Sequence, residues 1–123
     1  MSPFFSVADG NGLRGEIPLE LTRLTTLRVV QLGSNRDISG KLPSDLQRLS
    51  LLEHFAVSRN KLSGTIPSEL CEMTTLRQLF MGFNEFEGSI PSCLDSLINL
   101  ETLFVSILGD LCRQFIKSSN LLP

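Results

Sequence analysis

A glycine followed three residues later by a proline recurs along this chain at a nearly constant spacing. The pairs are Gly15 with Pro18, Gly40 with Pro43, Gly64 with Pro67 and Gly88 with Pro91, so successive glycines are 25, 24 and 24 residues apart. A repeat of this length forms one structural unit that buries its apolar face only against the next unit. The period therefore predicts a stack of coils that share one core.

Apolar residues occupy fixed columns within each period. Residues 49–70, LSLLEHFAVSRNKLSGTIPSEL, read L-x-x-L-x-x-F-x-V-x-x-N-x-L-x-G-x-I-P-x-x-L. Around the phenylalanine, apolar residues alternate with others at a period of two, which predicts a short strand with one buried face. Stacked coils bring equivalent strands side by side into a parallel sheet. The predicted central column of that sheet is Val30, Phe55, Leu79 and Leu103.

The apolar columns and the asparagine after each strand resemble the leucine-rich repeat pattern, and the added G-x-I-P segment resembles the plant-type class of that family. That class is found in receptor-like kinase ectodomains and polygalacturonase-inhibiting proteins. The resemblance covers about residues 11–105 and implies an α/β fold, a right-handed leucine-rich repeat solenoid that forms a segment of a horseshoe. It also implies a parallel β-sheet on the concave face and short helical or 3-10 turns on the convex side.

We expect a single leucine-rich repeat domain, residues 1–123, with about three full repeats and a partial unit at each end. Regular repeats occupy about 11–105, and the tail 106–123 is irregular because Leu108 stands where a fourth asparagine belongs. Since an open coil exposes apolar core, these ends favour a fragment of a longer array. The alternative is a small complete protein in which Phe4 and Phe5 cover the first coil.

Three elements of the motif have predicted structural roles. The asparagines are expected to form a ladder that satisfies backbone groups where each strand ends, and they are Asn35, Asn60 and Asn84. The glycines are expected to permit a φ angle or a close approach that a Cβ would block, and the prolines to end the hydrogen-bonded run. The segment NRDISG has one residue more than its counterparts, which predicts a bulge around Arg36 and Asp37.

Composition and residue placement argue against several functions. A net charge of −2 provides no basic field for nucleic acid, and no run approaches the roughly 20 apolar residues of a membrane span. The single histidine, His54, projects from the concave strand, whereas Cys71 and Cys93 lie in convex segments, so no Cys–His dyad is expected. No zinc-ligand set or phosphate-binding glycine loop is found. We expect no enzyme activity, cofactor or metal site, and any kinase domain would lie outside this chain.

Side chains between the buried strand positions are expected to form the concave surface. Its C-terminal part holds a predicted apolar patch of Phe80, Phe83, Phe104 and Ile107, with Phe80 beside Phe104 and Phe83 beside Ile107. We interpret this patch as the hot-spot region for a protein or peptide ligand, with a polar surround of His54, Arg59, Gln78 and Thr102. The alternatives are that the tail segment LCRQFI covers the patch, or that the patch drives self-association, for which the open solenoid ends are another route.

Charged and sulfur-containing residues also form patterns. A column of alternating sign, interpreted as structural, holds Arg28, Glu53, Arg77 and Glu101, and each exposed ion pair contributes only about 0 to 1 kcal/mol. Three cysteines cannot all pair within the chain. Cys71 with Cys93 has marginal geometry, Cys93 with Cys112 is a second possibility, and free thiols are a third. A disulfide would suit an extracellular location.

The resemblance implies a non-catalytic recognition module, extracellular or at the cell surface. Such a module is the ligand-binding region of a receptor-like protein or a secreted inhibitor of hydrolases. The alternative is an intracellular scaffold or adaptor with the same surface. The ligand itself is not readable, because side chains on a repeat scaffold vary independently of the repeat.

Overall fold

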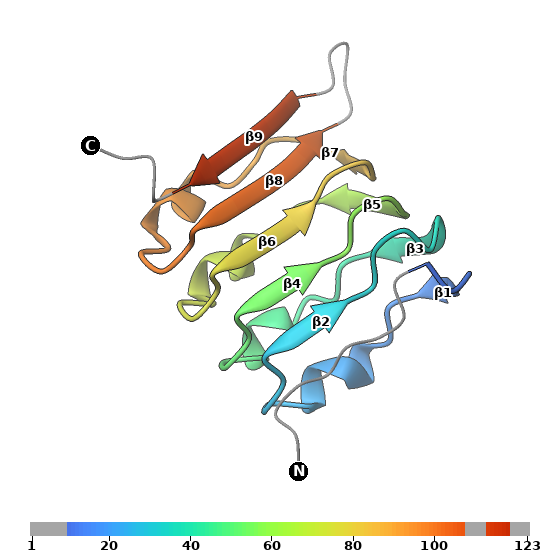
Figure 1. The fold of residues 1–123 in the computed structure, drawn as a ribbon, viewed down its shortest axis with the longest axis horizontal. Helices are drawn as coiled ribbons and strands as arrows, with labels where there is room; N and C mark the ends of the chain where they lie inside the picture. Colours follow the sequence, from blue (N-terminus) through green and yellow to red (C-terminus); the bar gives the residue numbers. More distant parts are fainter. Residues whose placement is uncertain (1–9, 108–112, 119–123) are drawn as a thin grey trace.

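The computed structural model describes residues 10–107 and 113–118, and Phe4, Phe5, Leu108 and Cys112 lie outside the described residues. Each regular coil passes through a strand of one sheet, a strand of a second sheet and a 3-10 helix (Figure 1). No helix in the described ranges is long and apolar enough to cross a membrane. The coils stack as the period predicts.

Two sheets run through the stack. The five-stranded sheet, which carries the predicted concave face and is called the concave sheet below, has the order β2 (Val29–Gln31), β4 (His54–Ala56), β6 (Gln78–Met81), β8 (Thr102–Ile107) and β9 (Arg113–Ser118). The four-stranded sheet has the order β1 (Arg14–Glu16), β3 (Asp37–Lys41), β5 (Lys61–Thr65) and β7 (Glu85–Glu87). The 3-10 helices are η1 (Leu19–Arg23), η2 (Leu46–Arg48), η3 (Ser68–Glu72) and η4 (Ser92–Ser96).

The predicted central column of the concave sheet is confirmed. Backbone pairing places Val30 beside Phe55, Phe55 beside Leu79, and Leu79 beside Leu103, all in parallel strands. These four side chains are at most 5% exposed and belong to one core cluster that extends from the first coil to the last. Burying a side chain such as that of Phe55 stabilises the fold by roughly 1.5 to 3 kcal/mol, and the recurrence of the column multiplies that gain.

The four-stranded sheet was not anticipated from the sequence. Three of its strands hold one deeply buried residue each in a short stretch, Ile38 in β3, Leu62 in β5 and Phe86 in β7, whereas all three residues of β1 are exposed. A single inward residue between exposed ones is too short a signal to distinguish a strand from a turn. The pairing is also offset from the repeat, because Gly40 pairs with Leu62 and not with Gly64.

Three of the four motif glycines meet both conditions that the sequence analysis proposed, whereas Gly15 has a φ of +90° and no described atom within 4 Å of a Cβ built on it. Gly40, Gly64 and Gly88 have φ angles of +81°, +78° and +81°. A Cβ on Gly64 would lie 3.1 Å from the side chain of Lys41, and one on Gly40 would lie 2.6 Å from that of Glu16. Each of these three glycines therefore supplies a left-handed backbone and a seat for a side chain of the preceding coil.

The three asparagines are buried and hydrogen-bonded to backbone, but they are not equally satisfied. Asn84 Nδ2 donates to Val57 O at 3.0 Å, and its Oδ1 accepts from Leu62 N at 3.0 Å. Asn35 Oδ1 likewise accepts from two backbone amides, at 3.0 and 3.1 Å. Asn60 Nδ2 donates to Leu32 O at 2.8 Å, whereas its buried Oδ1 has no hydrogen-bond partner among the described residues.

The extra residue in NRDISG explains this difference. It lies in the coil that Asn60 faces and is accommodated by a left-handed backbone at Arg36, where φ is +73°. Arg36 N donates to Arg59 O at 3.1 Å, so the extra residue is hydrogen-bonded to the next coil. In the next coil Leu62 N donates to Asn84 Oδ1, but no described backbone amide donates to Asn60 Oδ1.

The two ends of the described stack differ. At the first coil, Leu24 is 47% exposed, whereas its counterpart Leu49 in the next coil is 0% exposed. At the other end, β9 pairs antiparallel with β8 and extends the concave sheet beyond the last regular coil (Figure 1). The tail therefore folds back along the edge of β8, an arrangement that the repeat pattern does not contain.

Candidate functional site

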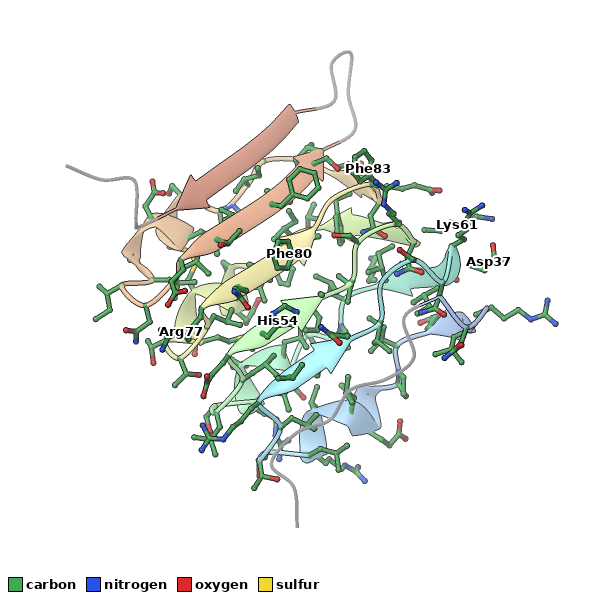
Figure 2. All side chains as sticks on the ribbon, in the orientation of Figure 1. Asp37, His54, Lys61, Arg77, Phe80 and Phe83 are labelled. Carbon is green, nitrogen blue, oxygen red and sulfur yellow. A yellow bond between two sulfur atoms is a disulfide. The ribbon has the colours of Figure 1, made fainter. Side chains whose placement is uncertain are left out.

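The outward side chains of the concave sheet form the candidate site. Strand alternation buries Phe55 and Leu79 and leaves their neighbours His54, Gln78 and Phe80 half-buried. Backbone register places His54 beside Gln78, Gln78 beside Thr102, and Phe80 beside Phe104. His54 and Phe80 therefore lie on adjacent strands of one surface (Figure 2).

A hydrogen-bonded row of polar side chains crosses three strands of this surface. His54 Nδ1 lies 2.7 Å from Gln78 Oε1, and His54 Nε2 lies 3.3 Å from Gln31 Nε2. The geometry fits an imidazole that donates from Nδ1 to Gln78 and accepts at Nε2 from the amide of Gln31. Gln31 was absent from the predicted site, although its place in the column of Ala56 and Phe80 is a signal that identifies it.

The aromatic side chains separate into two groups. The Phe80 ring packs against His54 with a centroid distance of 5.6 Å, and the Phe104 ring packs against Phe83, also at 5.6 Å. Arg59 completes the second group, because its Cζ lies 4.4 Å from the centroid of the Phe83 ring. Phe80 and Phe104 are thus neighbours in backbone register, but their rings contact different partners.

The expectation that Ile107 is exposed beside Phe83 is wrong. Ile107 is 7% exposed and belongs to the core cluster. Phe83 leaves the strand through a left-handed backbone at φ +57°, whereas β8 continues as a strand to Ile107. Continued alternation points Ile107 inward, on the same side as Leu103 and Val105.

A recurrent turn orients the side chains at the end of each concave strand. Ser34, Arg59 and Phe83 immediately precede the asparagines and have φ angles of +56°, +61° and +57°. Ser106 Oγ accepts a hydrogen bond from Phe83 N at 2.7 Å, and the Ser106 side chain is buried. Phe83 is 43% exposed, so a strained backbone holds a bulky aromatic ring at the surface.

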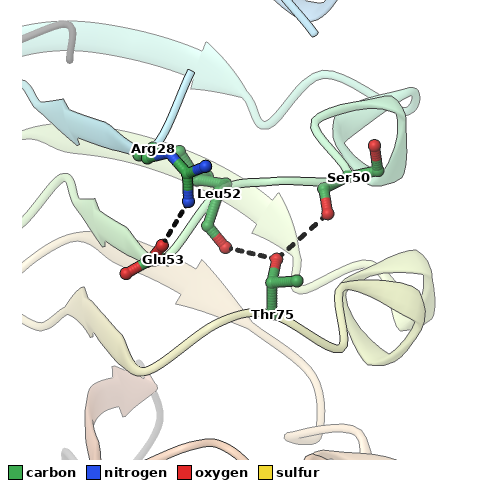
Figure 3. A network of polar contacts seen from close by, with 5 residues as sticks. All are labelled: Arg28, Ser50, Leu52, Glu53 and Thr75. Atoms are coloured by element: carbon green, nitrogen blue, oxygen red, sulfur yellow. Dashed lines mark hydrogen bonds and ion pairs between the residues drawn. The ribbon is translucent and has the colours of Figure 1, made fainter. Parts of the chain in front are cut away.

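The charge column forms two ion pairs. Arg28 Nη1 lies 2.7 Å from Glu53 Oε2 (Figure 3), and Arg77 pairs with Glu101. Thr75 Oγ1 lies 2.7 Å from the carbonyl oxygen of Leu52 and links the loop that holds Glu53 to the loop that holds Arg77. Because the paired side chains are 31% to 57% exposed, each pair contributes about 0 to 1 kcal/mol.

The convex side carries a disulfide between Cys71 and Cys93. The two cysteines lie in η3 and η4 of adjacent coils, with a Cα–Cα distance of 5.7 Å that is ordinary for a disulfide. Of the alternatives left open by the sequence, this is the one the structure contains.

Comparisons with known proteins agree with the repeat pattern. The Leucine Rich Repeat family profile matches residues 51–73 and 75–97. No match is found among curated protein sequences.

Several solved structures with the same fold are plant receptor ectodomains. The ectodomain of the membrane receptor kinase GASSHO1/SCHENGEN3 from Arabidopsis thaliana, solved with CASPARIAN STRIP INTEGRITY FACTOR 2, is 34% identical with a TM-score of 0.74 over 86% of this chain and 13% of that chain. The BIR2 ectodomain from Arabidopsis thaliana is 30% identical with a TM-score of 0.74 over 82% of this chain and 54% of that chain. A plant ice-binding protein is 27% identical with a TM-score of 0.75 over 85% of this chain and 34% of that chain. This chain therefore spans only part of each.

The two stacks of parallel strands, the 3-10 turns and the buried asparagines define a leucine-rich repeat solenoid. The recurrent G-x-I-P segment and the receptor ectodomains among its structural neighbours specify the type. The chain belongs to the leucine-rich repeat family, in its plant-type class.

Proposed function

We propose that this chain is the ligand-binding part of an extracellular receptor-like protein and that a protein or peptide ligand binds across its concave sheet. The observation that carries the proposal is the aromatic surface along β6 and β8, in which Phe83, just after β6, is 43% exposed and packs against Phe104, and Phe80 is half-buried beside Phe104 in backbone register. Aromatic side chains of this kind supply most of the binding energy at hot spots.

The structural neighbours and the disulfide support this assignment. Several neighbours are plant receptor ectodomains, and the receptor kinase HAESA was solved with a peptide hormone and a co-receptor. The Cys71–Cys93 disulfide favours an oxidising compartment, because cytosolic thiols are kept reduced. A secreted inhibitor would bind its target through the same concave surface, whereas an intracellular scaffold fits the disulfide poorly.

The test is selection of ligands by the secreted chain from a random 12-residue peptide display library. Peptides enriched by the wild-type chain are expected to bind the Phe80→Ser, Phe104→Ser double variant at least about tenfold more weakly, since two hot-spot rings are lost. Ile98→Ser is the matched control, because Ile98 is 88% exposed and its loss removes apolar surface away from the concave strands. Unchanged binding by the double variant would place the site elsewhere.

A further inference from the structure

Arg59 differs from the two arginines of the charge column. Arg28 and Arg77 are each paired with a glutamate of the adjacent coil. Arg59 is exposed and makes no ion pair with any carboxylate in the described part of the chain. The equivalent positions in the neighbouring coils hold Ser34 and Phe83. Arg59 therefore has an aromatic neighbour at this position and no acidic one.

The environment of Arg59 prepares its guanidinium for an anion. With Cζ 4.4 Å from the Phe83 centroid, one face of the guanidinium rests on the ring, and its N–H groups remain at the edge. Guanidinium is weakly hydrated, and the ring removes further water from one face. A carboxylate can then accept two parallel hydrogen bonds from that edge.

The backbone of Arg59 is anchored on both sides. Arg59 N donates to Gly82 O at 2.9 Å, and Arg59 O accepts from Arg36 N at 3.1 Å. Its φ of +61° is one that a residue other than glycine adopts at a cost. Anchoring and stacking restrict the side chain before a ligand arrives, which lowers the entropy lost on binding.

We infer that Arg59 selects the ligand, and that the ligand is a peptide segment carrying an aspartate or glutamate next to an apolar residue. The carboxylate binds the edge of the Arg59 guanidinium, and the apolar neighbour packs on Phe83 and Phe104. This inference rests on the proposed function, because it assigns a chemical class to the ligand of the same surface. Because the chain's net charge is −2, the molecule as a whole does not attract an acidic peptide. The attraction of the ligand carboxylate therefore comes from Arg59 itself and acts at short range.

The experiment repeats the 12-residue display selection on three chains: wild type, Arg59→Gln and Arg77→Gln. Peptides enriched by the wild type are expected to contain acidic residues next to apolar ones and to bind Arg59→Gln about tenfold or more weakly. Arg77→Gln is the matched control, because it removes a positive charge just before β6, away from Phe83, and leaves the stack of Arg59 on Phe83 intact (Figure 2). Its affinity is expected within about twofold of wild type. Higher salt is expected to weaken the wild type more than Arg59→Gln.

Arg59→Lys provides a second variant that keeps the charge and loses the planar pair of donors, and its binding is expected to fall between wild type and Arg59→Gln. Enriched peptides that lack an acidic bias, or that bind wild type and Arg59→Gln equally, would overturn the inference. If those peptides still lose affinity for the Phe80→Ser, Phe104→Ser variant, the proposed function stands and only the role of Arg59 fails. If the wild type enriches no peptide, both fail together.

Discussion

The inner and outer columns of the same strands follow different rules. Inside, Val30, Phe55, Leu79 and Leu103 are all apolar, all buried and paired in register. At the turn that ends each strand, Ser34, Arg59 and Phe83 share one backbone conformation and nothing else, being a hydroxyl, a cation and an aromatic ring. The comparison teaches that stacking constrains shape at every position but constrains chemistry only where the coils share a core.

The convex bridge lies on the structural side of this comparison and should have the largest effect on stability. Replacing Cys71 and Cys93 by serine is expected to lower the free energy of unfolding by about 3 kcal/mol, because the disulfide closes a loop with a sequence separation of 22. Urea unfolding with and without reductant measures the loss, and peptide affinity should stay unchanged. A large fall in affinity with an intact fold would link the convex side to the ligand site.

The buried asparagines provide an interior comparison between two coils. Asn84→Leu is expected to destabilise by roughly 1 to 3 kcal/mol, because it leaves Leu62 N and several carbonyls without their partner. Asn60→Leu should cost less, because Asn60 Oδ1 has no partner to lose among the described residues. Urea midpoints for the two variants test this order, and equal losses would show that the extra residue leaves the ladder intact.

Removing the backbone strain at Arg36, where the extra residue is accommodated, should stabilise the chain slightly. Arg36→Gly is expected to raise the free energy of unfolding by about 0.5 to 1 kcal/mol, since glycine adopts the φ of +73° without strain. Arg36→Ala is the control, because it removes the same side chain and keeps the strained backbone. A gain in both variants would assign the effect to the side chain and not to φ.

The smallest expected change in stability is at Phe83. This variant best separates the role of the outer turn residues in binding from the role of the core in stability. Phe83→Asn should leave the free energy of unfolding within about 0.5 kcal/mol of wild type, because asparagine tolerates a left-handed φ and offsets the lost ring contacts. Affinity for peptides enriched by the wild type should nevertheless fall. Retained affinity would show that the strained ring serves the fold alone.

Much of the site's backbone frame is predictable, and much of its surface is not. Spacing alone placed His54 beside Gln78 and Phe80 beside Phe104. The same spacing paired Phe83 with Ile107, which failed because β8 does not turn where Phe83 turns. Side chains outside the core also choose among several neighbours, and the ring of Phe80 packs on His54 while that of Phe104 packs on Phe83.

The amino-acid sequence by itself determined the coil, its central column and the glycine positions with left-handed backbone, because a period of about 24 residues repeats one burial pattern in every copy. Only the tertiary structure decided the second sheet, the pairing of Cys71 with Cys93, the return of β9 along β8 and the stack of Arg59 on Phe83. Those features depend on distances between neighbouring coils and on side-chain rotamers, and a one-dimensional pattern contains neither.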